Sequence, residues 1–136
     1  MQKRTKLEKG VTLENTFKVL PNKTANYFSE SSAEKYAEVL GTPFLIADME
    51  KVCAALMRPL LVNDEVSVGA HIDVSHTAST GVGASYVIIA EFESVRWGLY
   101  TFAVEAKDSI GIIGKGKIVR AIGSNSKILQ RANQAV

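Results

Sequence analysis

Hydrophobic residues change their spacing once along this chain, and the change separates a helix from a set of strands. Residues 44–61 are apolar on most sides, as in a helix that other structure encloses. Thr42 and Pro43 stand just before this run and suit the N-cap and the first helical position. Beyond it, apolar and polar residues alternate, which predicts strands over 66–77, 86–95, 99–107 and 112–122.

The flanking segments are less regular. An imperfect alternation over residues 11–20 indicates a first strand, and the proline, asparagine and serine residues that follow it indicate a loop. Residues 32–40 predict a short helix with Ser32 as its cap, and the tail "NSKILQRANQ" predicts one or two helical turns.

These elements predict one architecture. Glycine-containing turns between the later strands indicate an antiparallel meander, and the long apolar helix is available to cover one face of the sheet. We predict an α+β fold, the hot-dog fold, in which a curved antiparallel five-stranded sheet wraps around a long central helix as a single domain over residues 1–136. Because such a sheet leaves edge strands to pair, we expect a homodimer.

Composition narrows the class of protein. The formal net charge is only +2, so we expect neither a nucleic acid nor a membrane as partner. The basic cluster "MQKRTKLEK" lacks the apolar run of a signal peptide and is interpreted as a solvated terminus. No charge-free apolar run approaches the roughly 18 residues of a membrane span. The single cysteine, Cys53, suits a small buried hydrophobe, so we expect a cytoplasmic protein without a metal site or cofactor.

One carboxylate in the helix is out of place. At about 100° per residue, Asp48, Lys51 and Arg58 share a sector that predicts a solvent-facing stripe. Glu50 points away from that sector, toward apolar side chains. A carboxylate there must be paired or hydrogen-bonded, and it is also a candidate acid or base. The pattern leaves the structural and the catalytic interpretations of Glu50 open.

Strand pleating separates the two histidines of the stretch "VGAHIDVSHTAST". His71 shares a face with Asp73, as in a surface pair, whereas His76 ends the apolar face formed by Val66, Val68, Ala70, Ile72 and Val74. His76 is therefore either a core histidine or a partner for Glu50 in the layer between helix and sheet. Gly69 marks either a kink or a close approach to a ligand, and pleating turns it away from His76 unless a bulge intervenes.

The segments "TPFLIADMEKVCAALMRPLL" and "VGAHIDVSHTAST" together resemble the fluoroacetyl-CoA thioesterase-like branch of the hot-dog thioesterases. The shared pattern is Thr-x7-Glu in the helix and Gly-x6-His-Thr in the next strand, and the resemblance extends from the first strand through "GKGKIVRAI". It implies that Thr42, Glu50 and His76 are catalytic. It also implies that the N–H of Gly69 binds the thioester carbonyl and that Arg120 lies near the substrate.

The implied reaction is hydrolysis of a short-chain acyl-CoA to the free acid and CoA. Glu50 either activates water or attacks the thioester itself, and His76 serves as general acid or base. Tyr36 and Phe44 are expected to line the substrate site. Tyr36 replaces a phenylalanine of the fluoroacetyl-CoA enzyme, Pro43 a glycine and Ala33 a second aromatic residue, which favours a different acyl group.

Two other functions fit the same pattern. The first is a non-hydrolytic protein that binds acyl-CoA or another small ligand, because fold does not fix function. The second is a dehydratase acting on an acyl thioester, although its usual aspartate-to-histidine motif is not evident. Lys115 and Lys117 are candidate contacts for the CoA phosphates, but alternation points them away from Arg120.

Overall fold

A computed structural model describes residues 6–136, so the first five residues of the amino-terminal basic cluster lie outside the described residues. The helices and strands are β1 (Thr12–Lys18), α1 (Thr42–Met57), β2 (Glu65–His76), β3 (Ser85–Arg96), β4 (Leu99–Lys107), β5 (Ile112–Ser124) and α2 (Asn125–Gln134). Short 3-10 helices form η1 (Pro21–Lys23), η2 (Ala25–Phe28), η3 (Ser32–Glu34) and η4 (Arg58–Leu60).

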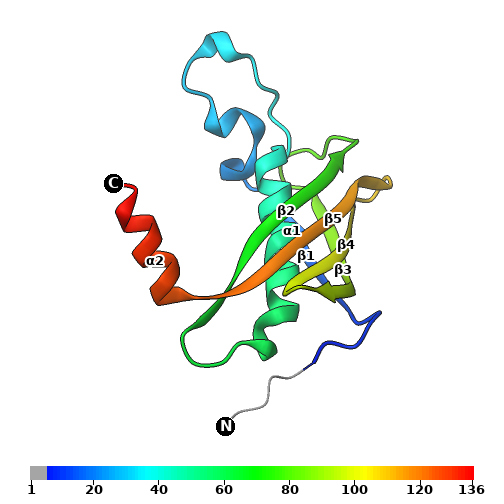
Figure 1. The fold of residues 1–136 in the computed structure, drawn as a ribbon. Coiled ribbons are helices and arrows are strands. Elements are labelled where there is room, and N and C mark those ends of the chain that lie inside the picture. Colours follow the sequence, from blue (N-terminus) through cyan, green and yellow to red (C-terminus); the bar gives the residue numbers. More distant parts are fainter. Residues whose placement is uncertain (1–5) are drawn as a thin grey trace.

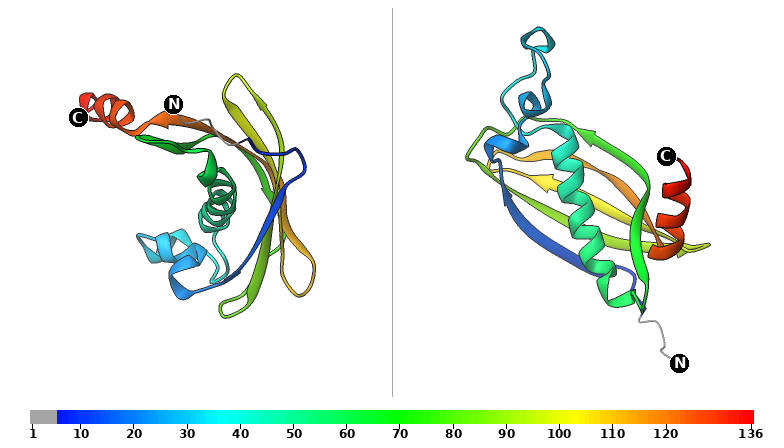
Figure 2. Two further views of the ribbon diagram at one scale, coloured as in Figure 1. Left: turned by 90° about the horizontal axis from the view of Figure 1, so that it is seen from below. Right: turned by 90° about the vertical axis from the view of Figure 1, so that its left-hand side faces the viewer.

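The sheet has five strands in the order β1-β3-β4-β5-β2, and each neighbouring pair is antiparallel. It curves around α1, which lies against its concave face (Figures 1 and 2). The predicted strands are confirmed to within two residues at each end, and β3, β4 and β5 form the predicted meander. β2 pairs with β5, so β1 and β2 are the edge strands of the sheet.

The core lies between α1 and the concave face. Its largest fully buried side chains come from the helix, the three central strands and the segments beside them: Tyr86, Phe102, Leu40, Leu45, Met49, Met57, Leu60, Ile88, Ile113 and Ile118. This burial explains why the central helix is apolar on most sides, as the sequence predicts. None of the helices among residues 6–136 is long and apolar enough to cross a membrane.

The start of α1 differs from the prediction. Gly41, not Thr42, is the N-cap, and Thr42 is the first helical residue. A Cβ atom at Gly41 would lie 3.1 Å from the main chain of Ala25 and 3.0 Å from the ring of Phe44, closer than most real Cβ contacts. Glycine therefore allows the preceding segment to cross close to the helix start, and the Thr42 hydroxyl is released for another partner.

The predicted solvent stripe of α1 is wrong for Asp48. Lys51 is 66% exposed, but the Asp48 side chain is only 1% exposed. Its burial is compensated, because Oδ2 accepts hydrogen bonds from Lys23 Nζ at 2.9 Å and from the hydroxyl of Tyr86. Helical periodicity could not reveal these partners, since they come from η1 and β3.

The predicted helix over 32–40 is also wrong. Only η3 forms, with Ser31 and Glu34 making a reciprocal capping box, and Lys35 ends it in the left-handed region at φ 57°. The rest of this segment returns to the helix start through a β-bridge between Thr24 and Leu40. The tail forms a longer helix than predicted, and Figure 1 shows α2 standing away from the sheet.

Candidate active site

The strand that carries both histidines contains a β-bulge. In the pairing of β2 with β5, Gly69 lies opposite Arg120 and His71 lies opposite Val119, so Ala70 is the extra residue. A bulge of this kind shifts the alternation of side chains by one position. Odd-numbered residues therefore face α1 before Ala70, and even-numbered residues face α1 after it.

The predicted strand faces are right after the bulge and wrong before it. His76 faces the helix side as predicted, since it pairs with Gly114, where an added Cβ would lie 3.1 Å from the Leu45 side chain of α1. Before the bulge, Ser67 and Gly69 face α1, whereas Val66 and Val68 had been assigned to that face. The bulge thus places Gly69 and His76 on the same face of the sheet.

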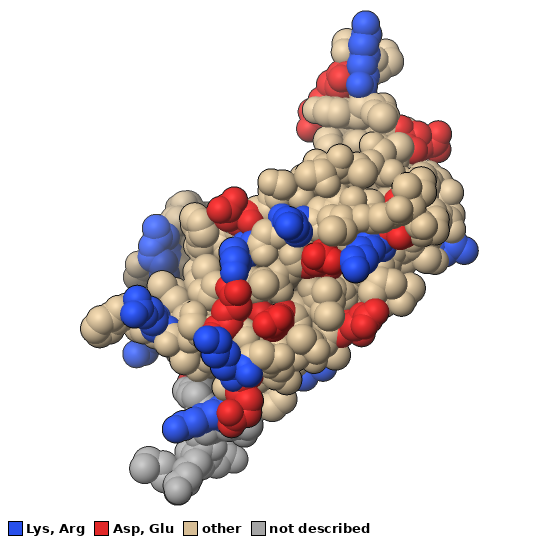
Figure 3. Space-filling view, turned by 90° about the vertical axis from the view of Figure 1, so that its right-hand side faces the viewer, with Lys and Arg blue, Asp and Glu red and all other residues tan. Residues whose placement is uncertain are grey.

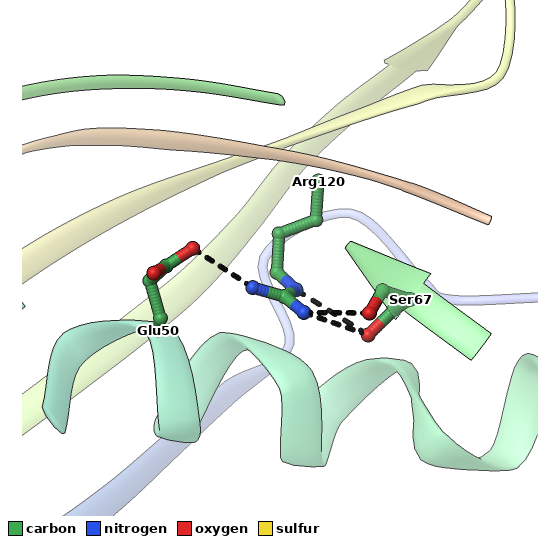
Figure 4. A network of polar contacts seen from close by, with 3 residues as sticks. All are labelled: Glu50, Ser67 and Arg120. Atoms are coloured by element: carbon green, nitrogen blue, oxygen red, sulfur yellow. Dashed lines mark hydrogen bonds and ion pairs between the residues drawn. The ribbon is translucent and has the colours of Figure 1, made fainter. Parts of the chain in front are cut away.

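Glu50 and Arg120 form an ion pair between helix and sheet (Figure 4). Arg120 Nη1 donates to Glu50 Oε1 at 2.9 Å, and Nη2 donates to the main-chain oxygen of Ser67 at 2.9 Å. The Arg120 side chain is 10% exposed and that of Glu50 is 29% exposed. Arg120 thus fixes one oxygen of a carboxylate that borders solvent, and within residues 6–136 Oε2 makes no hydrogen bond.

Gly69 lies directly beneath this carboxylate. A Cβ atom added there would come closer to Oε1 of Glu50 than real Cβ atoms ever approach an oxygen, so only glycine fits without displacing the carboxylate. A hollow of about 430 Å³ opens at this point, lined by Glu50, Gly69, Ala70, His71 and Ile72. The hollow runs along the β2 edge and gives a ligand access to Glu50.

Thr42 and His76 form a second polar pair, at the other end of β2. Thr42 Oγ1 and His76 Nδ1 lie 2.8 Å apart and share a hydrogen bond. Among the described residues, the buried Nε2 of His76 has no hydrogen-bond partner. Burial lowers the pKa of His76, an effect that outweighs the opposing influence of the Ala78 main chain, so the ring is neutral near pH 7. When Thr42 donates to Nδ1, the neutral ring carries its hydrogen on Nε2.

The two polar pairs are separate within one chain. Thr42 and Glu50 are eight residues apart in α1, which is about 12 Å along the helix axis. No hydrogen bond joins the Thr42–His76 pair to the Glu50–Arg120 pair among residues 6–136. The direct Glu50–His76 partnership expected from the sequence is therefore not formed within a single chain.

Four aromatic rings form a cluster at the start of α1, where the ring of Phe44 lies against Gly41. Phe28 lies 4.8 Å from Tyr36 and 6.3 Å from Phe44, and Tyr27 lies 6.2 Å from Phe44, all between ring centroids. Tyr36 is 44% exposed and Tyr27 62% exposed. The structure therefore brings Tyr36 and Phe44 into one partly exposed cluster, to which Tyr27 and Phe28 also belong.

The candidate CoA-phosphate contacts lie elsewhere. Alternation along β5 turns Lys115 and Lys117 to the convex face, and Lys117 forms an ion pair with Glu93. Figure 3 shows this face, where basic and acidic side chains are interspersed. Arg120 alone of the three faces α1, as the alternation predicts.

Two further observations limit the chemistry of the site. Cys53 is buried near Glu50 and Arg120, and burial raises the pKa of its thiol to about 12, which makes it a poor nucleophile. Within residues 6–136, no group of three or more His, Cys, Asp or Glu side chains is arranged to hold a metal ion.

Sequence reasoning missed Ser67 and allowed for a bulge without locating it. Ser67 holds the guanidinium of Arg120 through its main-chain oxygen and, at 3.1 Å, its hydroxyl. Strict alternation assigned Ser67 to the outer face, so the error follows from the one extra residue at Ala70. Gly69 is the available signal, since a glycine inside a strand often accompanies a bulge.

Comparisons with known proteins agree with this geometry. The family model described as fluoroacetyl-CoA-specific thioesterase matches residues 19–126. A fluoroacetyl-CoA thioesterase of Streptantibioticus cattleyicolor is 34% identical over 128 residues, which cover 90% of this chain and 92% of the relative.

Solved structures give the same result. A structure of the fluoroacetyl-CoA thioesterase FlK has a TM-score of 0.92 at 31% identity and covers 97% of this chain and 99% of its own. A thioesterase superfamily member from Thermus thermophilus, 21% identical with a TM-score of 0.83 over 94% of this chain and 92% of its own, shares the fold. The resemblance predicted from the two motifs is thus confirmed. The chain belongs to the fluoroacetyl-CoA-specific thioesterase family and is a thioester hydrolase with the hot-dog fold.

Proposed function

We propose that the chain hydrolyses short-chain acyl-CoA to free acid and CoA, with Glu50, Thr42 and His76 as its catalytic residues. The ion pair of Glu50 with Arg120 carries this proposal, because it holds a carboxylate directly over Gly69 at a hollow that is open to solvent. A thioester bound there would meet a base or nucleophile, and the Gly69 N–H would donate to the developing oxyanion. CoA enters as part of the substrate, and we propose no cofactor and a cytoplasmic location.

The proposed reaction uses the two polar pairs at different stages. Glu50 Oε2 accepts a proton from water as the water oxygen attacks the thioester carbonyl carbon, or it attacks that carbon itself and forms an anhydride that water then cleaves. The C–S bond breaks and its electrons leave with the CoA sulfur. His76, which is neutral, donates a hydrogen bond from Nε2 to that sulfur, and Thr42 holds the ring through Nδ1. The thiolate takes its proton from Glu50 when water attacks directly, and from water when the anhydride forms. Both routes to the acid remain part of the proposal.

A second copy of the chain would bring the two pairs together. β2 is an edge strand with its long side open, and Ile72 near its middle is 40% exposed. Antiparallel pairing of two β2 strands about a two-fold axis near Ile72 and Asp73 would set Gly69 of one protomer alongside His76 of the other. We therefore propose a homodimer with two active sites, each combining Glu50 from one protomer with His76 from the other.

The first test is hydrolysis of a panel of acyl-CoAs of increasing chain length, fluoroacetyl-CoA included, followed by the release of free CoA thiol. Glu50→Gln and His76→Ala should each lose at least about 10²-fold in kcat/KM, because each removes a group from the reacting centre. Glu91→Gln is the matched control and should retain activity, since alternation in β3 turns the exposed Glu91 to the convex face, away from α1. Equal rates for wild type, Glu50→Gln and His76→Ala would contradict the assigned mechanism.

The panel also separates hydrolysis from binding. Saturable binding of CoA esters without release of CoA from any member would support the binding-protein alternative instead.

Light scattering in solution tests the dimer directly, and a mass of one chain would contradict the shared site. Tyr36 and Ala33 change the wall near Thr42, so we expect the preferred acyl group to differ from fluoroacetyl.

A further inference from the structure

The most deeply buried carboxylate of α1 is not the proposed catalytic one. Asp48 is 1% exposed, whereas Glu50 is 29% exposed. Asp48 Oδ2 accepts from Lys23 Nζ at 2.9 Å and from the Tyr86 hydroxyl, and Lys51 Nζ lies 3.4 Å from Oδ1. A buried charge persists only when it is paired and hydrogen-bonded, so the partners of Asp48 are required for its burial. The position of this cluster in the fold indicates what the pairing achieves.

Lys23 contacts the helix in two places. Its main-chain oxygen accepts a hydrogen bond at 2.8 Å from the N–H of Gly41, the residue directly before Thr42. Its side chain passes over the ring of Phe17, 5.2 Å from the centroid, and reaches Asp48 in the second turn of α1. One residue thus braces the helix start from outside, at two points separated by seven residues of sequence.

The two ends of the aromatic segment, residues 25–39, meet beside Lys23. Ala25 N–H donates to the main-chain oxygen of Val39 at 2.8 Å, and Leu40 N–H donates to the main-chain oxygen of Thr80 at 2.8 Å. Thr80 lies in the loop that follows His76. The strand end that carries His76, the start of α1 and the base of the aromatic segment therefore meet within a few residues of Lys23.

The helix start depends on these outside contacts. Its N-cap is Gly41, which has no side chain with which to cap the first turn, and Pro43 follows with no N–H. Thr42 must nevertheless hold its hydroxyl 2.8 Å from His76 Nδ1. Small displacements of the first turn would lengthen that hydrogen bond before they disturbed the core.

We infer that the Lys23–Asp48 ion pair, completed by Tyr86, is a positioning device that sets Thr42 against His76. Lys23 and Asp48 are thus positioning residues, and neither touches the substrate. The inference rests on the proposed roles of Thr42 and His76. It predicts that breaking the pair lowers kcat more than it raises KM, because Asp48 points about 160° away around the helix from Glu50 and the hollow beside it.

The direct test is the imidazole ¹⁵N spectrum, which contains signals from His71 and His76 only and is assigned with a His71→Asn variant. In the wild type, Nδ1 of His76 should show a strong hydrogen bond and Nε2 should carry the hydrogen. Lys23→Met and Asp48→Asn should both weaken the Nδ1 hydrogen bond and lower kcat by about 10- to 10²-fold.

Lys51→Met is the matched control. Lys51 approaches the other oxygen of the same carboxylate but belongs to α1 itself, so it cannot brace the helix against another element. Its His76 signals and kcat should equal those of the wild type. Unchanged His76 signals and kcat in Lys23→Met would overturn the inference.

A triple variant separates positioning from stability. Lys23→Met/Asp48→Leu/Tyr86→Phe replaces the cluster with apolar groups and leaves no unpaired buried charge, so it should fold even where Lys23→Met does not. Low kcat and a weakened Nδ1 hydrogen bond in this folded variant would support positioning, whereas wild-type values of both would overturn it. If the wild type hydrolyses no acyl-CoA, the proposed function fails, while the His76 signals still decide the inference.

Discussion

Replacing Gly69 with alanine tests the site at its most crowded point. The new methyl group would overlap Oε1 of Glu50, the flexible end of a side chain, rather than any main-chain atom. Glu50 must withdraw by about 1 Å, and a misplacement of about 1 Å costs on the order of 10² in rate. That corresponds to about 2.7 kcal/mol of lost transition-state stabilisation.

The fold should tolerate the same substitution. Alanine in a strand is favoured over glycine by roughly 0.5–1 kcal/mol, which offsets the displacement of one side chain. We therefore expect the free energy of unfolding of Gly69→Ala to stay within about 1 kcal/mol of the wild type. The proposed site thus predicts a loss of rate without a loss of stability.

The assay combines CoA release under saturating substrate with urea unfolding. Gly111→Ala is the matched control, since a Cβ atom there meets nothing within 4 Å, and it should change neither quantity. Gly116→Ala should do the opposite of Gly69→Ala and unfold the protein more readily, because its Cβ would overlap the main chain of Asp73. A Gly69→Ala enzyme with a kcat within two-fold of the wild type would refute the placement of Glu50 over Gly69.

Three further predictions concern stability and reactivity. Burial lowers the pKa of His76 in the folded protein, so the folded state binds fewer protons than the unfolded state below about pH 6.5. The free energy of unfolding, measured with urea, should therefore fall from pH 7 to pH 5. The fall should be smaller in His76→Gln. Cys53, with its pKa raised to about 12 by burial, should not react with a disulfide reagent at pH 8 until the protein is unfolded, and rapid labelling of the native protein would contradict its burial. Ile118→Ala should cost about 2–5 kcal/mol of unfolding free energy because Ile118 is fully buried, whereas Ile89→Ala on the convex face should cost under about 1 kcal/mol.

Much of the fold follows from local pattern. The strands and the central helix were predictable because alternation and helical periodicity depend on neighbours in sequence. Thr42 was misassigned as the N-cap because a threonine before a proline normally suits that position. The close crossing of Ala25, which requires glycine at position 41, is a tertiary contact that local pattern does not contain.

The candidate site was predicted by motif more than by geometry. The two spaced motifs led us to propose Thr42, Glu50, Gly69 and His76, but pleating could not place Gly69, because the extra residue at Ala70 reverses the alternation. Helical periodicity correctly turned Glu50 away from the solvent stripe.

The buried charge that periodicity overlooked is Asp48. Its partners, Lys23 and Tyr86, lie 25 and 38 residues away in sequence, beyond any local pattern.

Mixed dimers test the central claim most directly. Glu50→Gln and His76→Ala chains, each inactive alone, are combined by refolding together, and CoA release is measured. If each site takes Glu50 from one protomer and His76 from the other, a mixed dimer has one site with both substitutions and one site with neither. Mixing should restore about half of the wild-type activity per mixed dimer, whereas no recovery in dimers shown to have mixed would contradict a site shared between two chains.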